Sequence, residues 1–101
     1  MWLCFNDGFI SVVEYRHNRE KLLIRSRRAD ILRSLFPTKR IIRNDARDYR
    51  YRVDATRAEF FPLIAERIMN IDYFNFKESV QDYELHRLYD DFSTLQQGYQ
   101  R

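Results

Sequence analysis

The chain has 101 residues, of which 45% are hydrophobic and 16% aromatic, with two prolines, two glycines and one cysteine. This composition excludes a long disordered chain and is typical of one compact domain spanning residues 1–101. Cys4 cannot form an internal disulfide, no stretch approaches the roughly 20 apolar residues of a membrane span, and the start, MWLCFNDGF, lacks a basic leader. We therefore expect a cytoplasmic protein.

Three strands are predicted in the first 28 residues. Residues 2–5 and 9–15 are rich in aromatic and β-branched side chains, and the Asn-Asp-Gly sequence between them favours the positive φ angles of a tight turn, which predicts a β-hairpin. Residues 21–28 alternate, with Ile24 on one face and Arg25 and Arg27 on the other, which predicts a third strand. Cys4 is interpreted as a small core residue of the first strand.

A helix and two further strands follow. Residues 29–36 place apolar side chains on one helical face, and Pro37 ends that helix. A short strand at 39–43 and a turn at 44–48 precede the last strand, at 49–54. In this strand the alternation places Tyr49, Tyr51 and Val53 on the apolar face, opposite Arg50 and Arg52.

Two helices with clear start signals complete the order. Thr56 and Glu59 fit a capping box, although Pro62 is expected to bend this helix or delay its start. Asp82 is expected to cap a final helix with an apolar stripe, and Gly98 to end it. The order β-β-β-α-β-β-α-α predicts an α+β two-layer fold, in which helices pack on one face of a mostly antiparallel sheet.

The net charge of +3 hides an uneven distribution. Residues 16–57 hold 14 Lys and Arg against five Asp and Glu, whereas residues 58–101 hold four against eight. A basic segment of this kind suits an acidic partner, either protein or nucleic acid. Alternatively, the basic and acidic parts face each other, within one chain or across a homodimer.

The arginines of the strands are the main candidate site. If helices cover the apolar face, Arg25, Arg27, Arg50 and Arg52 can form a positive patch on the other face, with Arg40 and Arg43 nearby. Such a patch can contact phosphates or hold carboxylates through bidentate pairs. The alternative is a solvated face whose arginines pair with acidic neighbours. Because the tyrosines are expected on the apolar face, base stacking is disfavoured.

A second candidate is the segment IDYFNFKESV at 71–80. Exposed aromatic side chains in a connection often bind partners, which makes Tyr73 and Phe74 candidate contacts. The alternative is that these aromatics fill the seam between the sheet and the final helix. Asn75 followed by Glu78 also resembles the cap of a short helical turn.

No motif for catalysis, a metal or a cofactor is present. Gly8 and Gly98 are isolated, and no cluster of His, Cys and carboxylates has metal-ligand spacing. His17 and His86 are interpreted as solvent-facing. We therefore expect a protein that is not an enzyme and needs no cofactor.

Three stretches resemble one family: MWLCFNDGFISVV at the start, DYRYRV in the middle, and IDYFNFKESV with LHRLYDDF near the end. They are similar to a widespread group of small bacterial and phage proteins of about this length, which open with a Met-Trp strand and carry an IDY-x-NFK segment. The resemblance covers nearly the whole chain. It implies no catalytic residue, and this chain is richer in arginine around residues 25–57.

Two functions compete. The first is a non-enzymatic protein-binding module, such as a phage or mobile-element inhibitor of host machinery that resembles an anti-CRISPR protein. Its partner is an acidic protein or a nucleic-acid-binding host complex. The alternative is a DNA- or RNA-binding protein that uses the arginine face. A small hydrolase or nuclease is least favoured.

Overall fold

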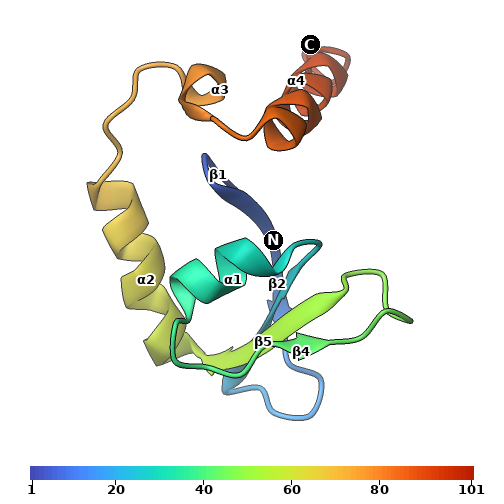
Figure 1. The fold of residues 1–101 in the computed structure, drawn as a ribbon, viewed down its shortest axis with the longest axis vertical. Coiled ribbons are helices and arrows are strands. Elements are labelled where there is room, and N and C mark those ends of the chain that lie inside the picture. The colour runs from blue at the N-terminus through green and yellow to red at the C-terminus, as the bar shows by residue number, and fades with distance from the viewer.

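A computed structural model describes all residues 1–101 and contains a five-stranded sheet and four helices (Figure 1). The strands are β1 (Trp2–Phe5), β2 (Gly8–Glu14), β3 (Lys21–Ser26), β4 (Ile42–Arg43) and β5 (Tyr51–Thr56). The helices are α1 (Ala29–Leu35), α2 (Arg57–Met69), α3 (Phe76–Ser79) and α4 (Tyr83–Gln97). The predicted α+β two-layer class is confirmed, and the predicted element order holds except for the additional four-residue helix α3 between α2 and α4.

The sheet has two faces of different character. All strand pairs are antiparallel, in the order β1-β2-β3-β5-β4, so β1 and β4 are the edges. The register sets Ile24 opposite Val53 and Arg25 opposite Arg52. Because successive side chains of a strand point to opposite faces, these two pairs lie on opposite sides of the sheet. We call the side of Ile24 and Val53 the covered face and the side of Arg25 and Arg52 the open face.

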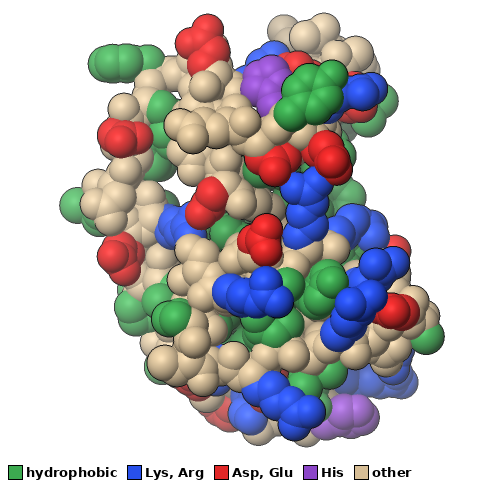
Figure 2. Space-filling model, viewed as in Figure 1, with side chains coloured by type: hydrophobic (Ala, Val, Ile, Leu, Met, Phe, Trp, Pro, Cys, Tyr) green, Lys and Arg blue, Asp and Glu red, His purple; other side chains and the backbone are tan.

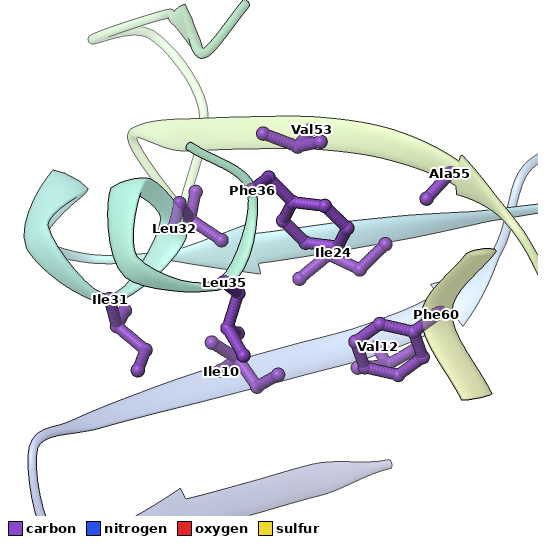
Figure 3. Close-up of a cluster of buried hydrophobic side chains, with 10 residues drawn as sticks. All are labelled: Ile10, Val12, Ile24, Ile31, Leu32, Leu35, Phe36, Val53, Ala55 and Phe60. Carbon is purple, nitrogen blue, oxygen red and sulfur yellow. The ribbon is translucent and has the colours of Figure 1, made fainter. Parts of the chain in front are cut away.

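The covered face forms the core with α1 and the start of α2. The side chains of α1 point toward those of the strands, and the rings of Phe36 and Phe60 stack with centres 6.2 Å apart (Figure 3). Burying each large apolar side chain stabilises the fold by roughly 1.5–3 kcal/mol. The core cluster consists of Ile10, Val12, Ile24, Ile31, Leu32, Leu35, Phe36, Val53, Ala55 and Phe60.

The helix starts follow the predicted caps. Thr56 and Glu59 form both halves of the capping box, and the Asp82 carboxylate accepts a hydrogen bond from the Leu85 N–H at 2.9 Å. The Lys39 ammonium, 2.7 Å from the Glu59 carboxylate, and the bonds from Thr56 lower the pKa of Glu59 to about 2. α2 begins at Arg57, so Pro62 does not delay its start.

The final helix, α4, packs against the β1–β2 hairpin on the side of the open face, because Trp2 and Phe9 lie on the same side of the strands as Ser11 and Arg25. By contrast, α1 and α2 pack on the covered face (Figure 1). The Phe92 ring lies 6.2 Å from the Trp2 ring and 5.8 Å from the Phe9 ring. The hydroxyl of buried Tyr89 lies 2.8 Å from the Phe5 carbonyl oxygen and 2.9 Å from that of Gly8. These contacts fix α4 to the hairpin.

The hairpin turn differs from the predicted one. No residue of the chain has a positive φ, and Gly8 lies in β2 opposite Phe5. A Cβ atom at Gly8 would lie 2.4 Å from the Cβ of Ile31. Glycine is therefore needed here because α1 approaches the strand closely, and the expected conformational reason is wrong.

Three element boundaries also move. β3 ends at Ser26, β4 contains only two residues, and β5 begins at Tyr51, two residues later than predicted. None of the four helices combines the length and apolar character that crossing a membrane requires.

Candidate binding surface

The open face carries a straight row of side chains with two arginines at its centre. The register aligns Ser11 of β2 with Arg25 of β3, and Arg25 with Arg52 of β5. Trp2 of β1 continues the row beyond Ser11, and Ile42 of β4 continues it beyond Arg52. We call these five residues the arginine row.

Arg25 is held firmly but is not neutralised. One of its terminal guanidinium nitrogens donates a hydrogen bond to the Ser11 hydroxyl at 2.8 Å, and its guanidinium carbon lies 4.7 Å from the centre of the Tyr49 ring. Its Nε is buried and has no hydrogen-bond partner. A buried donor without a partner costs roughly 1–3 kcal/mol, so stability alone does not explain an arginine at this position.

Arg52 stands beside Arg25 in a similar state. Its Nε donates a hydrogen bond to the Tyr49 carbonyl oxygen at 3.3 Å. Burial, together with the positive charges of Arg47 and Arg25, lowers the pKa of Arg52. Neither Arg25 nor Arg52 forms an ion pair with a carboxylate. An anion bound between them would reduce this repulsion.

The predicted position of Tyr49 on the apolar face is wrong. The bend at residues 47–50 interrupts the strand alternation before β5 begins, and the ring lies against the arginines of the open-face side. The guanidinium carbon of Arg27 is 4.4 Å from the ring centre, close to the 4.7 Å of Arg25. Tyr49 is only 5% exposed. It therefore orients two guanidinium groups by cation–π contact and cannot stack on a base.

Arg27 and Arg40 lie outside the row. Arg27 follows β3, donates a hydrogen bond to the Asp48 carbonyl oxygen at 2.9 Å and lies 3.4 Å from the Asp48 carboxylate. Arg40 is exposed between α1 and β4 and forms no ion pair. Arg27 thus borders the row through Tyr49, while Arg40 is separate from it.

Arg43 and Arg50 are neutralised locally, which corrects the expected patch. Arg43 pairs in register with Tyr51, so it points toward the covered side of the sheet. Arg50 lies in the bend before β5. Both approach the Asp45 carboxylate, at 2.8 Å for Arg43 and 3.4 Å for Arg50. Of the four arginines expected to converge, only Arg25 and Arg52 form the row without a carboxylate.

The acidic end of the chain neutralises a different arginine. Arg28 reaches Asp82 at 3.2 Å and also contacts Glu84, which joins the start of α1 to the start of α4. On the face drawn in Figure 2, Lys and Arg side chains are concentrated in the lower half. The basic and acidic parts therefore touch within one chain, but not at the arginine row.

In the second candidate, the segment 71–80, the two predicted contact residues lie in different environments. The half-buried Tyr73 has its ring 5.8 Å from that of Phe76, which lies 5.1 Å from the Tyr89 ring, so Tyr73 belongs to an aromatic seam. Phe74 is fully exposed. The Asn75 cap of the intervening turn is present, with its side-chain oxygen 3.1 Å from the Glu78 nitrogen.

Cys4 is exposed, which corrects its assignment to the core, because its side chain points to the face opposite Leu3. His17 is exposed, whereas His86 is half-buried and lies 3.3 Å from Asp90, so only His17 faces solvent freely. No three His, Cys, Asp or Glu side chains are grouped as metal ligands.

Sequence reasoning missed Trp2 and Ile42 as neighbours of the arginines. Trp2 is 63% exposed and Ile42 is 47% exposed, at the two ends of the row. In the sequence, Trp2 and Ile42 are recognisable only as apolar residues of short strands. Their position relative to Arg25 depends on the pairing of strands that are distant in sequence.

No protein-family model matches the chain, and neither a curated protein nor a solved structure matches it.

Proposed function

We propose that this chain is a non-enzymatic binding protein whose arginine row receives an acidic segment of a protein partner. The observation that carries the proposal is the pair Arg25 and Arg52, which stand side by side without a carboxylate. The nearby Arg27, Arg43 and Arg50 each have one.

The geometry of the pair favours carboxylate binding. Ser11 and the Tyr49 ring orient Arg25, and the Tyr49 carbonyl orients Arg52. Guanidinium groups that are already oriented lose less conformational entropy when they bind, and their fork matches a carboxylate. The partner would supply the negative charge that the free chain lacks at this point.

The ends of the row favour a protein surface over nucleic acid. Arginine flanked by exposed Trp2 and Ile42 matches the composition of protein interfaces, in which Trp and Arg often contribute most to affinity. DNA or RNA binding remains the second candidate, supported by the excess of positive charge in residues 16–57. Tyr49 cannot contribute base stacking because it is buried, so nucleic acid would be held through phosphates alone.

The biological setting that we propose is a phage or mobile-element inhibitor that docks on host machinery. Small size and a polarised charge distribution support this setting. The acidic segment would then belong to the host protein, and the bound chain would block the surface that carries it.

The test is affinity capture from nuclease-treated bacterial lysate with quantitative mass spectrometry. The bait is the intact chain, the Arg25→Glu/Arg52→Glu double variant, or Arg40→Glu, which changes an exposed unpaired arginine outside the row. We expect one stoichiometric protein on the wild type and on Arg40→Glu, and its loss from the double variant. Recovery of the same protein on the double variant would contradict the proposal. In an electrophoretic mobility-shift assay, binding of a DNA duplex or RNA strand by the wild type that disappears in the double variant would favour the second candidate.

A further inference from the structure

The first strand has a free backbone edge. β1 is the outermost strand, and the Met1 and Val12 backbones exchange hydrogen bonds of 2.9 and 2.8 Å. In an antiparallel pair, hydrogen-bonded and non-hydrogen-bonded residues alternate along the strand. The N–H and C=O groups of Trp2 and Cys4 therefore point away from β2, toward an edge where no other strand pairs.

Two hollows flank this edge. One, of about 540 Å³, lies on the covered side and is lined by Leu3 together with Leu63, Ile64 and Ile68 of α2. The other, of about 500 Å³, is lined by Phe74, Phe76 and Phe92 beside α4. Cys4 borders both hollows, so the edge of β1 is the ridge between them.

We propose that the edge of β1 binds an extended peptide segment of a partner protein by strand addition. The peptide would pair with the backbone of Trp2 and Cys4. Successive side chains of the peptide would point to opposite faces of the sheet. Apolar residues at every second position would therefore enter one hollow, and those at the positions between them would enter the other. Tyr73 lines the first hollow and Phe74 the second, which gives the connection between α2 and α3 a place in the same site.

Charge specifies the peptide further. Glu66 and Asp72 line the first hollow and form no ion pair, while Arg67 is paired with Asp7. A Lys or Arg next to the apolar residues of the peptide would complement the two carboxylates. A second copy of the chain is a poorer occupant, because two-fold pairing of β1 edges would bring Glu66 and Asp72 toward their own counterparts. The edge of β1 shares Trp2 with the arginine row but uses its backbone, so this inference goes beyond the proposed function and does not depend on Arg25 or Arg52.

The experiment selects a random twelve-residue peptide library, displayed on phage, against the immobilised intact chain. Synthetic copies of enriched peptides are then titrated, with the fluorescence of Trp2, the only tryptophan, as the readout. We expect enriched sequences with apolar residues and a nearby Lys or Arg. Two versions of each peptide are N-methylated at every second amide, one at the odd and one at the even positions. Methylation of the amides that face β1 should abolish binding, and methylation of those that face away should leave it intact.

Two exposed residues of α2 provide a matched pair of variants. Ile68 is 62% exposed and lines the first hollow, whereas Phe61 is 74% exposed and lines neither hollow. Ile68→Lys should weaken the peptide at least about tenfold, because it places a charge in an apolar site, while Phe61→Lys should not. Arg25→Glu/Arg52→Glu should also leave peptide binding unchanged, which separates the edge of β1 from the two arginines of the proposed function.

Several outcomes would overturn the proposal. They are the absence of enrichment over a blank support, equal effects of Ile68→Lys and Phe61→Lys, and equal affinity of both N-methylated peptides. A dimer in analytical ultracentrifugation that Ile68→Lys abolishes would assign the edge to a second copy instead.

Discussion

The covered and open faces of the sheet are built from alternate residues of the same strands, yet they contribute in opposite ways. Ile24 is completely buried against α1, whereas the next residue, Arg25, carries a charge that nothing in the chain neutralises. The covered face stabilises the fold by removing apolar surface from water. The open face keeps two like charges adjacent at a cost. Apart from the contacts of α4 with Trp2 and Phe9, folding depends on the covered face and leaves Arg25 and Arg52 of the open face available for a partner.

The largest expected difference is between two adjacent residues of β3. Ile24→Ala should lower the free energy of unfolding by about 2–5 kcal/mol, because it leaves a cavity in the core. Arg25→Met keeps an unbranched side chain beside Tyr49 and should change the free energy of unfolding by less than about 1 kcal/mol. Urea unfolding of both variants measures the contrast. Equal losses would mean that Arg25 is structural and that the open face is no freer than the covered one.

A smaller effect is expected where α1 approaches the covered face. Gly8→Ala should destabilise the fold by roughly 1–3 kcal/mol, because the new methyl group would overlap Ile31. Gly98→Ala is the matched control, since its Cβ would meet only the Leu95 carbonyl oxygen at 3.4 Å. Thermal unfolding of the two variants compares them. If both shift equally, close packing of α1 is not the reason for glycine in β2.

An effect of about 1 kcal/mol is expected at the outer end of the open face. Tyr89→Phe removes the hydroxyl that reaches the carbonyl oxygens of Phe5 and Gly8 and leaves the ring in place. The amide of Gly8 and those of α4 should then exchange with solvent faster, while those of β3 should not. Hydrogen exchange measures this, and uniform acceleration over the chain would show that α4 is not attached mainly through Tyr89.

Local signals made much of this fold predictable. The period-2 alternation of β3 separated Ile24 from Arg25, and the capping box at Thr56 fixed the start of α2, because both depend on residues that are close in sequence. The same alternation correctly placed Arg25 and Arg52 on one face. It failed at Tyr49, where a bend precedes the strand.

Features that depend on strand pairing or close approach were not predictable. Arg43 was assigned to the patch, but its pairing with Tyr51 turns it to the other side. Gly8 was explained by its own backbone, although Ile31 of α1 sets the requirement. The hollows beside β1 depend on how α2 and α4 pack around an edge, which a single strand pattern does not contain.

The smallest expected effect isolates the repulsion that distinguishes the open face. Arg52→Gln should leave stability unchanged or raise it by up to about 0.5 kcal/mol, because it removes the positive charge facing Arg25 and keeps a polar side chain. Added salt should stabilise the wild type more than this variant, since screening weakens repulsion between partly exposed charges. Arg40→Gln, at an exposed arginine away from the row, should keep the salt response of the wild type. Urea unfolding at low and high salt separates the three proteins. If Arg52→Gln lost stability at low salt, the two arginines would hold the sheet together, and the reason to expect an acidic partner at this face would disappear.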